Sequence, residues 1–221
     1  MFIRHVTIAG IFALFMAVAV QPKTVGAEEL GPRAEALIAK LADDAISKLT
    51  DPTVGLDEQE NRFRQIMQEY VAFQTIARWV LGGRYWRSAT DEQRERYLSI
   101  FEQLMVATYA HRFQRYTGET LEVAGVQSID ENQVLVRTTL KRPNADKPLH
   151  VDWRVRSTED KLRVIDIMVE GLSMAQTQRA EFSSLLRSNG GDVNALMANL
   201  ETRLKKARAE RLASNEEASQ K

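Results

Sequence analysis

Residues 121–169 read LEVAGVQSIDENQVLVRTTLKRPNADKPLHVDWRVRSTEDKLRVIDIMV. Apolar and polar residues alternate along much of this segment, a period of two that is typical of β-strands with one buried face. Four strands are predicted, over residues 121–126, 134–141, 149–156 and 162–169. The polar connections between them are short, so consecutive strands are expected to pair as an antiparallel meander.

The third of these strands has the clearest two-sided pattern. Leu149, Val151, Trp153 and Val155 alternate with polar or charged residues, so one face of the sheet is expected to be apolar and the other hydrated. The fourth strand breaks the alternation, because it has apolar residues at both parities and carries Asp166 among them. We therefore expect the fourth strand to be covered on both faces.

Helical periodicity precedes and follows the strands. Six helices are predicted, and their expected starts are Pro32, Asp57, Phe73, Thr90, Ser173 and Asp192. Capping-box patterns mark the starts at Asp57 and at Thr90, where Glu60 and Gln93 respectively lie three residues further on. The helix that begins at Thr90 is predicted to be the longest and to end at Gly118.

This order of helices, strands and helices indicates an α+β fold, with helices packed on one face of a four-stranded antiparallel sheet. The longest helix has an aromatic stripe that includes Phe101 and Tyr109, with Met105 between them. A stripe of this width needs cover from the sheet or from several helices. Taken alone, such residues are more often ordinary core than a ligand site.

The two ends of the chain differ from its middle. Arg4 and His5 precede an apolar run of about fifteen residues, which is too short to span a bilayer, and Val25-Gly26-Ala27 follows. This is the order of a cleavable secretory signal. We expect a signal peptide over 1–27, a single domain over 28–208, and a polar tail over 209–221.

Composition excludes several classes of function. The chain has 30 Lys and Arg against 30 Asp and Glu, and removal of residues 1–27 leaves a net charge of −2. No nucleic-acid partner is therefore expected, since such binding needs a clustered basic excess. The sequence has no cysteine, so disulfides, thiol catalysis and Cys-ligated metals are absent.

No catalytic or cofactor motif is found. The three histidines, His5, His111 and His150, have no zinc-type spacing, and neither a nucleophile elbow nor a phosphate-binding glycine loop occurs. Asp166 has two interpretations. It could be a general base with a raised pKa, or the partner of an arginine such as Arg84 in an ion pair, and the ion pair is favoured.

Two segments carry a family resemblance. LGGRYWRSAT at residues 81–90, followed by DEQRERYLSIFEQLMVATYAHRF, and VIDIMVEGLSMAQTQRAEF at residues 164–182 resemble the MlaC family, the toluene-tolerance family of periplasmic phospholipid-binding proteins. With the helices and strands around them, they cover nearly the whole chain after residue 27. Gly82-Gly83 doubles a glycine that is usually single, and Leu162 stands where the family often has Trp.

The resemblance implies a periplasmic carrier, without enzymatic activity or a cofactor. Its ligand would be a phospholipid with two acyl chains, and an apolar cavity between helices and sheet would hold them. Its partners would be an outer-membrane lipoprotein–porin complex and an inner-membrane ABC transporter complex with MCE domains. The expected lipid-binding residues are Phe101, Met105, Tyr109, Val136, Leu149, Val151, Trp153, Val155 and Met168.

Three alternatives stay open beside this one. A hopanoid-associated branch of the same family is similar, and it would carry a different lipid. A secreted small-molecule enzyme with a cone-like α+β fold would use Asp166 as its base. A structural adaptor of a membrane complex would share the fold but lack the cavity.

Overall fold

The computed structural model describes residues 27–51, 53–143, 145–158 and 161–219. The elements follow in the order α1 (Ala27–Leu49), α2 (Leu56–Tyr70), α3 (Phe73–Leu81), α4 (Gly83–Ser88), α5 (Asp91–Tyr109), the 3-10 helix η1 (Ala110–Arg115), β1 (Thr120–Asp130), β2 (Gln133–Lys141), β3 (Leu149–Thr158), β4 (Lys161–Val169), β5 (Leu172–Ser173), α6 (Met174–Ser188) and α7 (Val193–Ser219). The predicted signal segment lies outside the described residues except for Ala27, where α1 begins. None of the described helices is both long and apolar enough to cross a membrane.

The strands form one antiparallel sheet in the order β1-β2-β3-β4-β5. The α+β class and the meander of four strands are confirmed, and the sheet gains a fifth strand of two residues. Glu170 and Gly171, both with positive φ (50° and 78°), reverse the chain between β4 and β5. A strand of two residues is too short to produce a period-two signal, so the sequence pattern could not reveal it.

A β-bulge explains the unusual pattern of the fourth strand. In the β3–β4 pairing, Arg154 lies opposite Asp166 but Val155 lies opposite Val164, so Ile165 is an extra residue. An extra residue shifts the side-chain parity of the strand. Val164 and Ile167 therefore both face the core under α1, although they differ in parity.

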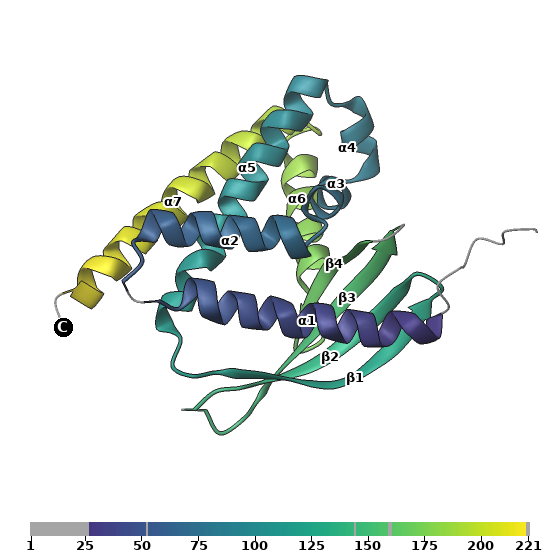
Figure 1. Cartoon of the computed structure of the whole chain (residues 1–221). Helices are drawn as coiled ribbons and strands as arrows, with labels where there is room; N and C mark the ends of the chain where they lie inside the picture. The colour runs from purple at the N-terminus through teal and green to yellow at the C-terminus, as the bar shows by residue number, and fades with distance from the viewer. Residues whose placement is uncertain (1–26, 52, 144, 159–160, 220–221) are drawn as a thin grey trace, which may run out of the picture.

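The helices divide into two groups, and each group has its own hydrophobic core. Figure 1 shows α1 lying across one face of the sheet, with α2 beside it, whereas α5 and α7 run side by side away from the sheet. The first core joins α1 and α2 to the strands, and the second core lies among α3, α5, α6 and α7. The helix predicted to be the longest corresponds to α5, but its 19 residues are fewer than the 23 of α1 and the 27 of α7. Its aromatic stripe is covered mainly by helices, which is one of the two kinds of cover expected.

Aromatic packing explains the position of α5. The ring of Phe101 lies 5.2 Å from that of Phe73 of α3 and 6.0 Å from that of Phe182 of α6, and Tyr97 lies 5.8 Å from Phe101. The Phe101–Phe182 pair is edge-to-face, an arrangement that aromatic pairs favour, while the Phe73–Phe101 pair is tilted and the Tyr97–Phe101 pair is stacked. The apolar stripe of α5 as far as Met105 is buried by other helices, whereas Val106 and Tyr109 at its end join the first core. The main cover of the sheet is α1.

Helix ends follow the sequence signals in part. The capping box at Thr90 is confirmed, since Thr90 and Gln93 exchange side-chain to backbone hydrogen bonds at 3.0 and 3.1 Å. The capping box predicted at Asp57 is wrong, because α2 starts at Leu56 after Gly55 with no side-chain cap. Pro32 lies inside α1 instead of at its first position, and α5 gives way to η1 at Ala110, well before Gly118.

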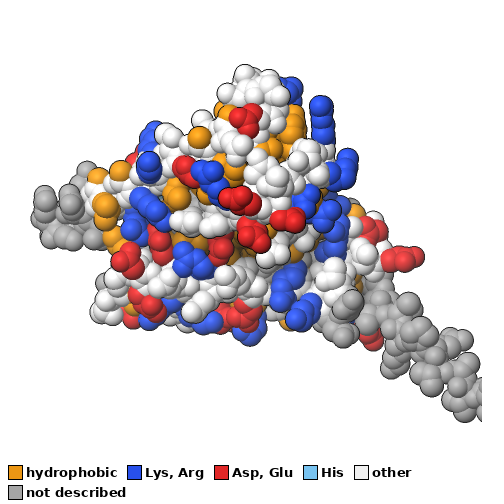
Figure 2. All heavy atoms as spheres, turned by 90° about the horizontal axis from the view of Figure 1, so that it is seen from above, with side chains coloured by type: hydrophobic (Ala, Val, Ile, Leu, Met, Phe, Trp, Pro, Cys, Tyr) orange, Lys and Arg blue, Asp and Glu red, His pale blue; other side chains and the backbone are white. Residues whose placement is uncertain are grey.

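The last helix extends into the segment where a polar tail is expected. α7 continues through residue 209 to Ser219. Arg211 is 11% exposed and forms an ion pair with Glu60 of α2. On the face shown in Figure 2, basic and acidic side chains are interspersed.

Candidate functional site

An apolar pocket of about 340 Å³ lies between α1 and the sheet. Ten of its thirteen lining residues are aliphatic or aromatic, and the other three are charged. The lining consists of Leu41, Ala42, Ala45, Ile46, Arg112, Phe113, Tyr116, Glu119, Leu121, Leu140, Arg142, Val151 and Trp153. A concave site of this kind suits an apolar ligand whose polar end stays near the mouth.

The roof of the pocket is one face of α1. Leu41, Ala42, Ala45 and Ile46 follow the helical spacing that places residues three and four apart on the same side. Two of the four are alanines, so their short side chains leave space beneath the helix. Larger residues at these two positions would fill that space.

The floor is the apolar face of β1, β2 and β3. Leu121 of β1 is opposite Leu140 of β2, and Val151 of β3 is opposite Thr138 of β2. Thr138 is 1% exposed, and its hydroxyl donates to the carbonyl of Val151 at 2.5 Å while accepting from Nε1 of Trp153 at 3.1 Å. The polar atom of Trp153 thus has a partner in the sheet, and the indole is fixed where it lines the pocket.

One edge of the pocket is formed by η1 and the residues that follow it. Phe113 packs against Phe63 of α2 with 6.0 Å between ring centroids. The hydroxyl of Tyr116 donates to the backbone carbonyl of Glu119 at 3.1 Å. These contacts hold both rings at the edge of the apolar space.

The predicted lipid-binding residues fall into three groups. Val151 and Trp153 line the pocket. Val136, Val155 and Leu149 lie on the same face of the sheet, since Val136 is opposite Trp153 and Leu149 is opposite Leu140, and Tyr109 packs against that core. Phe101, Met105 and Met168 are not brought to the pocket.

Those three residues have distinct surroundings. Phe101 and Met105 belong to the second core, among the helices. Met168 is opposite Asp152 of β3, so it lies on the other face of the sheet from Val151. The lining residues of α1 were not predicted from the sequence. Leu41 and Ala45 stood in the helical pattern, and Leu121 and Leu140 in the strand pattern, but none of them carried a signal for a ligand.

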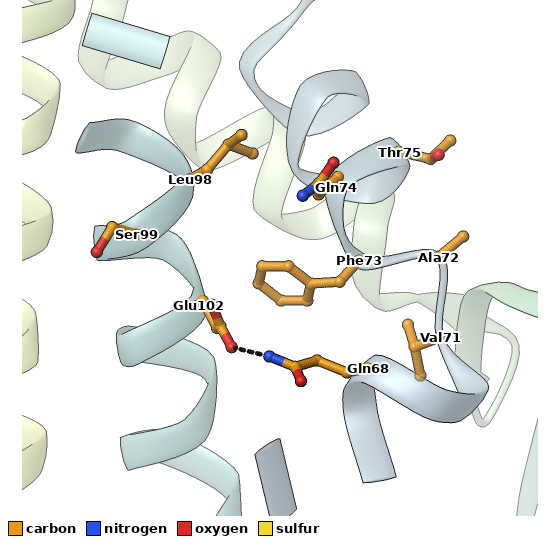
Figure 3. Close-up of a pocket in the computed structure, with 9 residues that line it drawn as sticks. All are labelled: Gln68, Val71, Ala72, Phe73, Gln74, Thr75, Leu98, Ser99 and Glu102. Atoms are coloured by element: carbon orange, nitrogen blue, oxygen red, sulfur yellow. Dashed lines mark hydrogen bonds between the residues drawn. The ribbon is translucent and has the colours of Figure 1, made fainter. Parts of the chain in front are cut away.

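A second hollow of about 480 Å³ lies where α2 meets α3, facing α5 (Figure 3). Five of its nine lining residues are polar, and Gln68 donates to Glu102 at 3.2 Å across it. Figure 3 shows the ring of Phe73 pointing from α3 toward α5 between these walls. Although this hollow is larger, it lacks the continuous apolar lining that a hydrocarbon ligand requires.

The side chain of Asp166 has a structural partner other than arginine. Its carboxylate accepts hydrogen bonds from the Ser173 hydroxyl at 2.5 Å, from the backbone of Ala175 at 3.1 Å and from its own neighbour Ile167 at 2.9 Å. Among the described residues no arginine forms an ion pair with Asp166, so that prediction is wrong. Arg154, its neighbour across the strands, donates instead to Gln133 at 3.0 Å.

Asp166 also lines neither hollow, which removes the geometric support for its use as a general base. Within the described parts of the chain, no group of three or more metal-ligating side chains comes together. The apolar pocket is therefore the candidate site, and its chemistry is that of binding.

The fold and the pocket together define a small α+β binding protein with an apolar site between one helix and an antiparallel sheet. Residues 39–202 match the sequence model of the MlaC protein family. The chain belongs to this family, which confirms the resemblance found in the sequence.

Two individual proteins are similar to this chain. One is the intermembrane phospholipid transport system binding protein MlaC of Haemophilus influenzae, which is 24% identical over 163 residues, covering 71% of this chain and 76% of that protein. The other is a phospholipid-binding protein from Ralstonia solanacearum, solved in complex with a phospholipid. It has a TM-score of 0.71 at 24% sequence identity, over 79% of this chain and 98% of that one. The second likeness is one of fold.

Proposed function

We propose that this chain is a periplasmic carrier that takes a diacyl phospholipid between an outer-membrane lipoprotein–porin complex and an inner-membrane ABC transporter complex with MCE domains. The observation that carries the proposal is the apolar pocket between α1 and the sheet. Membership of the MlaC family and the phospholipid transport named for the Haemophilus relative support it.

The energetics of lipid transfer explain why such a carrier needs this pocket. A phospholipid with two acyl chains has ~30 methylenes, and each contributes about 0.8 kcal/mol when it is removed from water. Free passage of the lipid through the aqueous periplasm is therefore extremely slow. Aliphatic and aromatic side chains on both walls replace water around the chains, and no chemical reaction on the lipid is required.

The size of the pocket implies a movement of its walls during loading. Its volume of about 340 Å³ lies near the lower end of the ~300–1,000 Å³ range of pockets for drug-sized ligands. Two acyl chains are larger than such a ligand, so α1 and the sheet must separate to admit them. None of the residues of the second core lines the pocket.

Organic extraction of the purified full-length product, followed by mass spectrometry, tests the proposal directly. The expected result is a phospholipid at close to one molecule per chain. Recovery of hopanoid lipids would instead support the related branch of the family. A protein that carries no lipid and takes up none from vesicles would contradict the proposal.

The proposed location can be tested on the same material. We infer that residues 1–27 are a signal peptide, so the recovered protein should begin at Glu28 and should be released with the periplasmic fraction. Intact mass or N-terminal sequencing reads this start. A membrane-bound product that keeps Met1 would show that the segment is an anchor instead.

A further inference from the structure

The three charged residues of the apolar pocket lie on its solvent-exposed rim, called the mouth below, because Arg112 and Arg142 are exposed and Glu119 is half-buried. Arg112 belongs to η1, Glu119 precedes β1, and Arg142 follows β2, while the remaining lining residues are uncharged. Thr120 is paired with Lys141 at the end of the sheet. Glu119 and Arg142 therefore lie one step beyond that pair, on adjacent chain segments.

The carboxylate of Glu119 already has hydrogen-bond donors in the preceding turn. Its carboxylate accepts from the backbone N–H of Thr117 at 2.7 Å and from the Thr117 hydroxyl at 3.2 Å. Burial acts to raise the pKa of Glu119, but these hydrogen bonds and the nearby charge of Arg142 outweigh burial and lower it. Glu119 is thus ionised at neutral pH and holds the turn at Gly118.

The two arginines are not neutralised in this way. Among the described residues, neither guanidinium forms an ion pair or donates a hydrogen bond, and both side chains are exposed. Arg112 lies over the ring of Tyr109, with its Cζ 5.0 Å from the ring centroid. Lys141, next to Arg142 in the chain, is paired with Glu122 at 2.6 Å and does not line the pocket, whereas Arg142 does.

A guanidinium has a planar fork of donors that matches the oxygens of a phosphate group. With Glu119 included, the lining residues of the mouth have a net charge of +1, which complements the single negative charge of a phosphodiester. A lipid whose chains lie between α1 and the sheet would have its head group at this mouth. Arg112 and Arg142 therefore supply two guanidinium groups to the rim at which this head group would lie.

We propose that Arg112 and Arg142 bind the phosphodiester of the lipid and make the pocket selective for phospholipids over uncharged lipids with the same chains. This inference rests on the proposed function, and it adds a head-group site to it. Glu119 opposes a second negative charge close to the phosphate. The site is thus suited to a phosphodiester and less suited to a phosphomonoester.

A competition assay with chain-matched lipids tests the inference. Dioleoylphosphatidylglycerol, dioleoylphosphatidylethanolamine and dioleoylglycerol each displace a fluorescent fatty-acid probe from the delipidated protein. For the wild type, both phospholipids should compete on the order of tenfold better than dioleoylglycerol, as charged hydrogen bonds to one phosphate allow. The Arg112→Gln, Arg142→Gln double variant should lose this preference and still bind dioleoylglycerol as well as the wild type does.

Two controls separate the head-group site from general effects of charge. Arg137→Gln removes a cation of β2 that does not line the pocket and whose guanidinium is hydrogen-bonded to Gln127, so the preference should persist. Inorganic phosphate should not displace the probe at millimolar concentration. Displacement by phosphate would show a free-anion site and would overturn the inference.

The remaining outcomes are also decisive. A wild type that binds all three lipids equally contradicts the head-group site but leaves the carrier function intact. A double variant that retains the preference contradicts the roles of Arg112 and Arg142. A wild type that binds none of the lipids removes the proposed function, and the inference with it.

Discussion

The carboxylate of Asp166 accepts a hydrogen bond from the hydroxyl of Ser173, and this contact joins β4 to the start of α6. Ser173 also accepts from the backbone of Gln176 at 3.0 Å, while Asp166 accepts from the backbone of Ala175. The two side chains thus satisfy N–H groups of the first turn, which have no partner inside the helix. Their role in the structure is to fix the second group of helices to the sheet.

Asp166→Ala should lower the free energy of unfolding by about 1–3 kcal/mol, because it leaves donors without a partner in a half-buried place. Ser173→Ala should cost less, about 1 kcal/mol, since it mainly removes a helix cap. Urea unfolding followed by circular dichroism measures both. A variant of Asp166 that keeps wild-type stability but loses lipid transfer would show a functional role for this carboxylate.

Acid should weaken the protein through Asp44. The hydroxyl of Tyr70 donates to Asp44 at 2.5 Å and Lys40 donates at 2.9 Å, and these bonds lower the pKa of Asp44 from 3.8 to about 2. A lowered pKa in the folded state stabilises the fold above pH ~4, and this contribution is lost as the pH falls from about 4 to about 2. It amounts to about 1 kcal/mol after allowance for solvent screening.

Tyr70→Phe should therefore reduce the loss of stability between pH 4 and pH 2, which is measured by urea unfolding at several pH values. Tyr85→Phe is the matched control, because the hydroxyl of Tyr85 has no hydrogen bond among the described residues. An identical pH profile for wild type and Tyr70→Phe would show that Asp44 is not held by this contact.

Val151→Trp should abolish co-purified lipid and leave stability near that of the wild type. Val151 lines a space that is underfilled without a ligand, so a larger ring can enter it, whereas overpacking of a filled core costs ~1–3 kcal/mol. Extraction with mass spectrometry measures the lipid, and thermal unfolding measures stability. Leu172→Trp, at a position that is 70% exposed, is the control. Unfolding of Val151→Trp would mean that Val151 is ordinary core.

Phe101→Ala should have the opposite effect. Phe101 is 2% exposed in the second core, so its truncation should cost about 3–5 kcal/mol of stability. Lipid content should be unchanged wherever the variant remains folded, because Phe101 does not line the pocket. Phe113 does line the pocket, so Phe113→Ala should reduce lipid content more than Phe101→Ala does. Loss of lipid from folded Phe101→Ala would place this residue in the binding site after all.

The sheet could be predicted from the sequence because the alternation of each strand and the turns between strands involve residues that are close together in the chain. Alternation in β3 and the short polar turns are enough to define strands and their antiparallel pairing. The capping box at Thr90 is local in the same sense. The bulge at Ile165 is not, since it depends on which residues of β3 and β4 face each other, and it decides that Met168 lies away from Val151.

The site was harder to predict because a pocket consists of volume that side chains do not fill. Helical periodicity reports that α1 and α5 each have an apolar face, but not which of them covers the sheet. The aromatic face of α5 looked better suited to a ligand than the alanines of α1. In the structure the large rings fill the second core, and the small residues at positions 42 and 45 leave the space.

The two hydrophobic cores are affected differently when the pocket is empty. Every apolar residue that lines the pocket belongs to the layer of α1, η1 and the strands, and none belongs to the core of α3, α5, α6 and α7. In the carrier that we propose, departure of the lipid would expose to water only residues of the first of these two layers. The core of α3, α5, α6 and α7 would stay packed in the empty protein. The carrier that we propose could therefore return unloaded without having to refold.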